Sequence, residues 1–293
     1  MRNNILEFTF SFTGNDSNAS EIDLYDVSQA LIGFQRSVAL TTHLVLNDEI
    51  ITQSPSLKGA KIYALPPETG SWKLTAAIVL TGAYNVATAP NNTPLGHLVY
   101  SLYDYVICES LGFHVDYNKS LGELYEKKEG EKSKIPLIKQ HKADSLIEKC
   151  STAIKEMHRP IYKTETATSA SIIANLSGRT LPINAKLSIN SYEFINETFT
   201  SNDPVTLEGR ISSYNSNTYK GRVYINEIGR PISFELTENV RHESVIRIIT
   251  ASLSANALKM YTDESSIVHF TAFKNESKAG HLKSLNIIDV QTN

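Results

Sequence analysis

Hydrophobic and polar residues alternate near the start of the chain. Leu6, Phe8, Phe10 and Phe12 are each separated from the next by one polar residue. A period of two with aromatic residues on one side is typical of a half-buried strand, so residues 4–13 are predicted to form a strand.

The spacing then changes to that of a helix. Apolar residues recur three and four positions apart, which predicts a helix over residues 21–46 with one apolar face. Because the pattern lasts for only about two heptads, we expect this face to pack on a sheet and not on a coiled-coil partner. The apolar positions are Leu24, Val27, Leu31, Phe34 and Val38.

Two further strands and a helical region complete the N-terminal part. Residues 60–66 and 71–80 have the pattern of strands, and residues 94–160 that of helices with a charged interruption. The order strand, helix, strand, strand predicts a small α+β sheet with helices on one face, in a domain over residues 1–160. Residues 161–204 are rich in Thr, Ser and Asn and are predicted to form a linker.

The last third of the chain predicts three strands, a helix over residues 243–258 and two more strands. Gly209 and Gly221 lie inside the first two strands, where glycine allows the bends that a small barrel needs to close. The order β-β-β-α-β-β resembles an OB-fold and predicts a five-stranded barrel with one helix over residues 205–293. An SH3-like barrel or an open sheet with one helix would have a similar order. The predicted strands are 205–214, 219–226, 230–237, 267–273 and 285–290.

Length and charge narrow the classes of protein. A chain of 293 residues is expected to form two domains, and its 41% of hydrophobic residues is typical of a globular protein. The net charge of -3 excludes a polybasic nucleic-acid coat and a strongly acidic DNA mimic.

The sequence shows no secretory signal and no transmembrane run. Its two cysteines, Cys108 and Cys150, fall in segments predicted to be helical, and so few thiols indicate a reducing compartment. A cytoplasmic location with no membrane partner is therefore expected.

Motifs of common active sites are absent from the sequence. It has no phosphate-binding P-loop, dinucleotide fingerprint, nucleophile elbow or zinc-protease helix. No histidine lies close in sequence to another histidine or to a cysteine, so no metal and no cofactor are predicted. His114 and Asp116 could share a metal or a proton if they lay on one strand, although a polar loop is the favoured interpretation.

One group of residues in the predicted barrel suggests a binding surface. Tyrosine rings can stack on bases while arginine and lysine meet phosphates, and Tyr and Arg also dominate protein interfaces. An ordinary solvated surface would have the same composition, and the negative net charge counts against nucleic acid. The candidates are Arg210, Tyr214, Tyr219, Lys220, Arg222, Tyr224 and Arg230.

Two N-terminal segments carry a resemblance to a known group of proteins. They are the turn and strand start at residues 66–72 and the helical segment at residues 24–33. With the barrel-like C-terminal part, they look like a family of uncharacterised two-domain proteins of bacteria and their mobile elements. The resemblance implies a component of a multi-protein system, with phage defence as one setting, and brings no catalytic residues.

The sequence therefore predicts a non-enzymatic adaptor or assembly component that binds a protein partner or its own copies. One alternative is a nucleic-acid-binding module that uses the OB-like barrel. The other is a metal-dependent nuclease or hydrolase with a dispersed acidic site.

Overall fold

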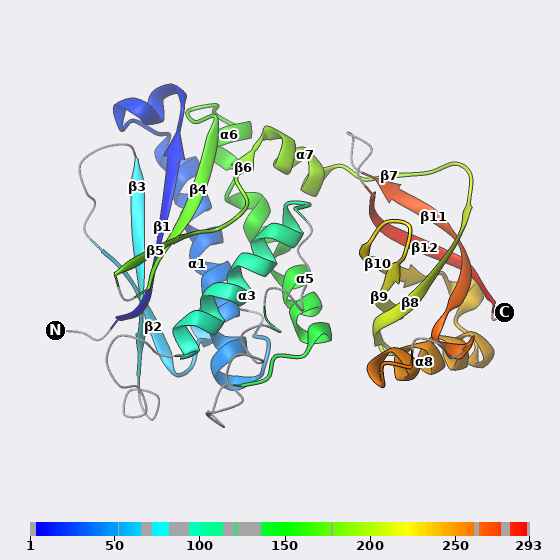
Figure 1. Ribbon diagram of the computed structural model, residues 1–293. Coiled ribbons are helices and arrows are strands. Elements are labelled where there is room, and N and C mark those ends of the chain that lie inside the picture. The colour runs from blue at the N-terminus through cyan, green and yellow to red at the C-terminus, as the bar shows by residue number, and fades with distance from the viewer. Residues whose placement is uncertain are drawn as a thin grey trace. The chain divides into compact units, whose positions relative to one another are not determined.

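The chain folds into two compact units, Met1–Ile195 and Asn196–Asn293, each with its own hydrophobic core. The structure is a computed structural model (Figure 1). It describes residues 4–51, 53–65, 72–81, 94–113, 121, 136–176, 178–260, 264–276 and 282–291. The predicted α+β class is confirmed.

The first unit contains an antiparallel sheet with β1 at its centre. The strand order is β2-β3-β1-β4-β5, and β6 also pairs with β4. The alternation that predicted β1 has the expected consequence, since Phe8, Phe10 and Phe12 are all fully buried. The strands are β1 Asn4–Thr13, β2 Ala60–Ala64, β3 Lys73–Leu80, β4 Ser169–Leu176, β5 Arg179–Pro182 and β6 Leu187–Ser188.

Helices cover the apolar face of this sheet (Figure 1). The ring of Phe10 packs 5.1 Å from that of Phe34 in α1, and the ring of Phe8 packs 4.8 Å from that of Tyr103 in α3. The helices are α1 Leu24–Asn47, α3 Pro94–Ser110, α5 Gln140–Glu156, α6 Arg159–Tyr162 and α7 Ile189–Asn196, with short 3-10 turns η1 Asn15–Ala19 and η2 Ser54–Ser56.

Helices α1 and α5 pack very closely at Gly33. A Cβ atom added to Gly33 would lie 2.3 Å from the carbonyl oxygen of Ala153 in α5. No other residue type fits at this crossing without moving one helix, because real Cβ contacts are never so short.

The segment predicted to be a linker, residues 161–204, contains β4, β5, β6 and α7 instead. Strand β4 pairs with β1 along Glu7–Thr13, so it belongs to the middle of the sheet. The division between the two units falls after Ile195. The linker prediction arose because two of the inward residues of β4 are alanines, Ala170 and Ala174, whose hydrophobic signal is weak among many Thr and Ser residues.

The second unit is a closed five-stranded barrel. Its strand order is β8-β9-β10-β12-β11, and β11 pairs back onto β8. Strands β10 and β12 are parallel and the other barrel pairs are antiparallel. With a helix between the third and fourth strands, this is the connectivity of an OB-fold, as predicted. The elements are β8 Val205–Asn215, β9 Lys220–Ile225, β10 Arg230–Leu236, η4 Glu238–Val240, α8 Glu243–Ala257, η5 Glu264–Ser266, β11 Val268–Glu276 and β12 Leu282–Gln291, while the two-residue β7 Phe199–Thr200 pairs with β11.

Gly221 allows the sharp bend that closes the barrel, as its position inside a strand predicted. A Cβ atom at this position would lie 2.2 Å from the carbonyl oxygen of Ser213 in β8 and 2.7 Å from the ring of Phe234 in β10. Strands β8, β9 and β10 therefore curve tightly around a position that holds no side chain.

Candidate functional site

A β-bulge in β8 decides which of its side chains face outward. The register between β8 and β9 shifts between Ile211 and Ser213. Helix α8 bonds the backbone at this point: Ile211 N donates to the Ser252 hydroxyl at 3.1 Å, and the Asn256 amide donates to Ile211 O at 3.1 Å. Because a buried backbone group without a partner is costly, α8 helps to hold the bulge in place.

Four of the seven predicted binding residues lie together on the outer side of β8 and β9. Arg210 is paired with Tyr224 across the two strands, and next along β9 come Arg222 and Lys220. Their neighbours Ile211 and Val223 are buried in the barrel core, so alternation turns these four side chains outward. We call this set the barrel face: Arg210, Lys220, Arg222 and Tyr224.

Charges on and beside the barrel face are partly balanced. Glu235 of β10 lies opposite Lys220 in the ladder, and their charged atoms are 3.8 Å apart. Arg241 donates to the same carboxylate at 3.2 Å. Arg222 is only 5% exposed, although it lies on the outer side. The face therefore combines paired charges with one buried guanidinium group.

The other three predicted residues lie elsewhere. The bulge turns Tyr214 inward, where its ring stacks 6.4 Å from that of Phe234, and burial raises the pKa of its hydroxyl. Tyr219 occupies the turn before β9 with a left-handed φ of 57°, and the Arg241 guanidinium lies 4.8 Å from its ring centroid. Arg230 donates to the carbonyl oxygen of Leu282 at 3.1 Å.

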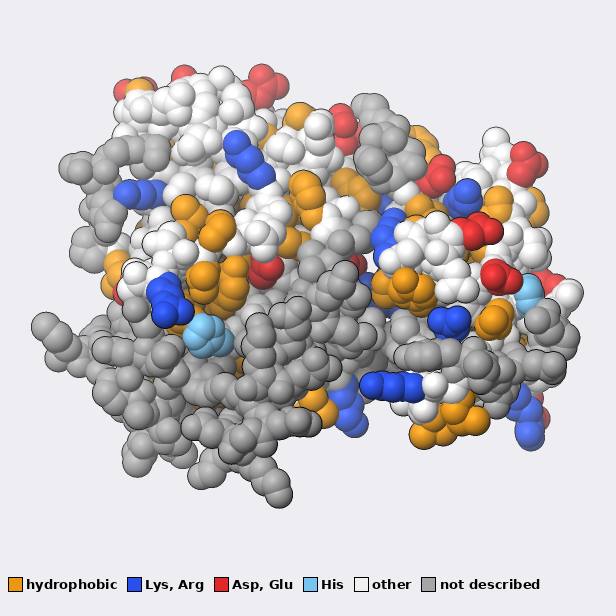
Figure 2. Space-filling model, viewed as in Figure 1, with side chains coloured by type: hydrophobic (Ala, Val, Ile, Leu, Met, Phe, Trp, Pro, Cys, Tyr) orange, Lys and Arg blue, Asp and Glu red, His pale blue; other side chains and the backbone are white. Residues whose placement is uncertain are grey.

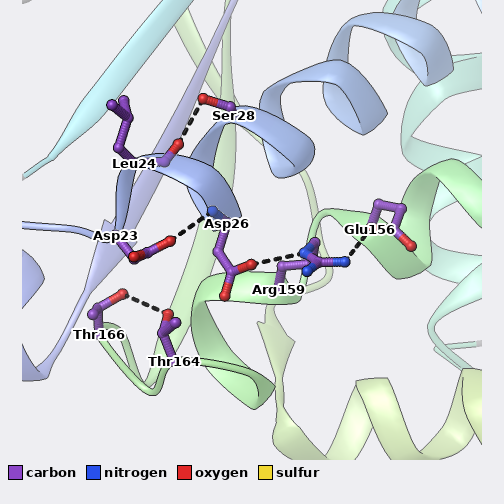
Figure 3. Close-up of polar contacts among 8 residues, drawn as sticks. All are labelled: Asp23, Leu24, Asp26, Ser28, Glu156, Arg159, Thr164 and Thr166. Carbon is purple, nitrogen blue, oxygen red and sulfur yellow. Dashed lines mark hydrogen bonds and ion pairs between the residues drawn. The ribbon is translucent and has the colours of Figure 1, made fainter.

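A second polar group lies at the start of α1 in the first unit (Figure 3). Asp23 caps the helix by accepting a hydrogen bond from Asp26 N at 2.8 Å. Asp26 is 2% exposed and accepts from Arg159 Nε at 2.9 Å, and Arg159 also donates to Glu156 at 3.2 Å. The hydrogen bond with Asp26 raises the pKa of the guanidinium.

This ion pair joins the N-terminal end of α1 to α6. The Arg159 guanidinium also lies 5.2 Å from the ring centroid of Tyr25. Sequence reasoning missed the pair because Asp26 and Arg159 are far apart in sequence, and neither belongs to a recognisable motif.

His158 and Ser191 form a buried pair that sequence reasoning also missed. His158 Nδ1 lies 2.8 Å from the carbonyl oxygen of Ile154, and a carbonyl oxygen only accepts, so Nδ1 carries the proton. Nε2 lies 2.9 Å from the Ser191 hydroxyl, whose single proton is shared between Nε2 and the carbonyl oxygen of Ser188 at 3.0 Å. Burial lowers the pKa of His158 to about 4. Ser191 is 4% exposed, and Ser188 N donates to its hydroxyl oxygen at 2.8 Å. The pair fixes the start of α7 to the end of α5 and is closed to a substrate.

The cysteines of the first unit, Cys108 and Cys150, are buried and free. Burial raises the pKa of both thiols, that of Cys150 to about 12, so neither is an activated nucleophile. Within the described ranges, no three His, Cys, Asp or Glu side chains converge as metal ligands would. The candidates His114 and Asp116, and residues 66–71 of the turn before Trp72, lie outside the described residues.

Comparisons with known proteins divide the chain as the structure does. One family model, Domain of unknown function (DUF7946), matches residues 8–190, and another, Family of unknown function (DUF7947), matches residues 203–291. No curated protein and no solved structure matches the chain significantly. Of the helices in the described parts, none is both long and apolar enough to cross a bilayer. The first family model covers more than half of the chain, so the chain belongs to the family Domain of unknown function (DUF7946).

Proposed function

We propose that this chain is a non-enzymatic adaptor whose C-terminal barrel binds a protein partner through the barrel face. The observation that carries the proposal is the register that sets Arg210 beside Tyr224 on the outer side of adjacent strands. Arginine and tyrosine are the residue types that most often supply binding energy at protein interfaces. An OB-type barrel commonly binds its ligands over its second and third strands, and three of the four residues of the barrel face lie on β9, the second strand.

The charge distribution favours a protein partner over nucleic acid. Lys220 of the barrel face and Arg241 beside it share the carboxylate of Glu235, so their positive potential is reduced. Figure 2 shows acidic and basic side chains interspersed among the described residues on the visible side of the barrel unit. Affinity for a phosphate backbone needs several unbalanced cations, whereas paired charges suit the rim of a protein interface.

Single-stranded nucleic acid is the second candidate, because the ring of Tyr224 beside Arg210 could stack on a base while the guanidinium meets a phosphate. The two candidates differ in salt dependence. Phosphate contacts lose a large factor in affinity between ~50 and ~200 mM salt, while an interface with balanced charges changes much less.

The test uses the full chain purified from its own cells with whatever binds to it. The double variant Arg210→Glu with Tyr224→Ala should lose a bound protein that the wild-type chain retains, as measured by native mass spectrometry. The matched control is Arg247→Glu on α8, an exposed arginine bonded to Glu243 within the same helix. It should keep the partner.

Two results would overturn the proposal. One is a wild-type particle at the monomer mass with no bound protein. The other is oligonucleotide binding that follows the Arg210 and Tyr224 substitutions and weakens steeply with salt, which would replace the protein partner with nucleic acid.

A further inference from the structure

The chain passes from the first unit to the second within a very short segment. Helix α7 Ile189–Asn196 lies at the end of the first unit, and β7 Phe199–Thr200 lies near the start of the second (Figure 1). Each of these elements is bonded to its own unit. The residues between the two sets of bonds therefore decide how freely one unit can turn against the other.

Side chains near the start of α7 anchor this helix to the first unit. The Ser191 hydroxyl lies 2.9 Å from Nε2 of the buried His158. One residue further on, the ring of Tyr192 stacks on that of Tyr162 in α6, with ring centroids 3.8 Å apart. These contacts join α7 to the segment that follows α5.

The anchoring continues to the last turn of α7. The ring of Phe194 lies against Gly112, where an added Cβ atom would be 2.8 Å from it. The next residue, Ile195, packs against the hydrophobic core of the first unit. The first unit thus holds the chain as far as Ile195.

The second unit holds the chain from Glu197 onward. Lys283 of β12 donates to the carbonyl oxygen of Glu197 at 3.0 Å and to the hydroxyl oxygen of Thr198 at 2.6 Å. A single ammonium group therefore fixes two consecutive residues to the barrel, one through its backbone and one through its side chain.

Strand β7 extends this attachment along β11. Thr200 lies opposite Asn275 in the ladder and donates to the Asn275 side-chain oxygen at 2.8 Å. Ser201 N donates to the carbonyl oxygen of Lys274 at 2.8 Å, and Lys274 N donates to the Ser201 hydroxyl at 3.0 Å. The barrel thus holds the chain over residues 197–201.

Asn196 lies between the two sets of anchors. It is exposed and is the last residue of α7. Hinges are commonly formed by such residues at the end of an element, which absorb a change in backbone dihedral angles. Asparagine suits the role because it enters the left-handed backbone region more readily than most residues.

So short a connection allows turning but not separation. The Cα atoms of Ile195 and Glu197 can lie at most ~7 Å apart, because two residues span no more than this when fully extended. A long flexible linker would let the units move apart, whereas a single residue changes only their direction.

We propose that Asn196 is a single-residue hinge about which the two units reorient, and that Lys283 keeps the hinge this short. Without the Lys283 hydrogen bonds, the free segment would extend from Asn196 to Thr198, where β7 begins next. The contacts that carry this proposal do not include the barrel face, so either proposal can fail while the other stands.

The first experiment measures residual dipolar couplings of backbone amides in the weakly aligned full chain. These couplings average over motions as slow as milliseconds. If the units reorient about Asn196, the couplings of each unit fit one alignment tensor, and the two tensors differ in magnitude. Equal magnitudes in the wild-type chain would mean that the units move as one body, which overturns the hinge.

The second experiment tests the part played by Lys283. Lys283→Met keeps most of the length of the side chain but removes the donor group. The amide order parameters of Glu197 and Thr198 should fall below ~0.6 in this variant, from the ~0.85 of a rigid backbone in the wild type. The two alignment magnitudes should also differ more than in the wild type.

The matched control is Lys274→Met, because Lys274 bonds the same segment through its backbone. It should leave the order parameters and the alignment magnitudes as in the wild type. Wild-type order parameters for Glu197 and Thr198 in Lys283→Met would overturn the role of this lysine. In each variant, the barrel couplings should still fit the structure of that unit, which verifies that the barrel is intact.

Discussion

At the scale of single residues, His158 should make the stability of the protein depend on pH. Its pKa falls from 6.5 to about 4 on folding because burial disfavours the charged ring. Between these values the unfolded chain binds a proton that the folded chain does not, so stability is lost as pH falls from 6.5 toward 4. The full loss is ~3 kcal/mol, and it is absent above pH 6.5.

His158→Gln isolates this effect, since glutamine retains hydrogen-bonding groups but does not titrate. Urea unfolding at pH 7.5 and at pH 5 should show a smaller fall in stability for the variant than for the wild type. His43, whose pKa is also lowered by burial, is present in both proteins and cancels in the comparison. Equal falls in the two proteins would show that His158 titrates normally in the fold.

Tyr214 shows where residue-level prediction ends. The sequence predicted the strand that contains it, and simple alternation places Tyr214 on the same side as Arg210. The bulge after Ile211 shifts the alternation by one residue and turns the tyrosine into the barrel. The bulge depends on hydrogen bonds with Ser252 and Asn256 of α8, and the sequence of β8 alone does not indicate these bonds.

At the scale of elements, the crossing of α1 and α5 predicts that a glycine-to-alanine substitution lowers stability where it would normally raise it. Replacing a glycine inside a helix with alanine normally stabilises the helix by ~1 kcal/mol. Gly33→Ala should instead destabilise the protein by ~1–3 kcal/mol, because the new Cβ would meet the Ala153 carbonyl at 2.3 Å. Urea unfolding measures the difference.

Gln35→Ala, on the same helix but about half a turn round from Gly33, is the control and should be neutral or slightly stabilising. If Gly33→Ala stabilised the protein as much as the control does, the two helices would have to be farther apart than the structure places them.

Elements were predictable where the local pattern was strong. Strand β1 was identified by its alternating phenylalanines, and α1 by its apolar spacing. Val27, Phe34 and Val38 are buried as predicted, whereas Leu24, in the first turn, is 79% exposed and does not pack on the sheet. Strand β4 was missed because its place depends on pairing with β1, more than 150 residues earlier in the chain. The barrel order was recovered because its five strands follow one another in the chain, with one helix between the third and the fourth, which leaves few ways to connect them.

At the scale of the whole molecule, the two hydrophobic cores share no residues. One is built from β1 to β6 and the helices around them, and the other from the barrel strands and α8. A unit with its own core can fold alone, and this defines a domain physically. The boundary should therefore lie where the cores separate, after Ile195, and not at the change in composition near residue 160.

Three fragments test this boundary. Fragments 1–195 and 196–293 should each unfold cooperatively in urea, because each retains a complete core. Fragment 1–160 should not unfold cooperatively, because it lacks β4. Without β4, one edge of β1 has no partner strand and the buried side chains of Ile172 and Leu176 are missing from the core. Dispersed amide signals in a proton–nitrogen NMR spectrum would report folding in each case. A folded fragment 1–160 would mean that β4 is an addition to a finished sheet, whereas its ladders to β1, β5 and β6 make it a strand that the sheet needs.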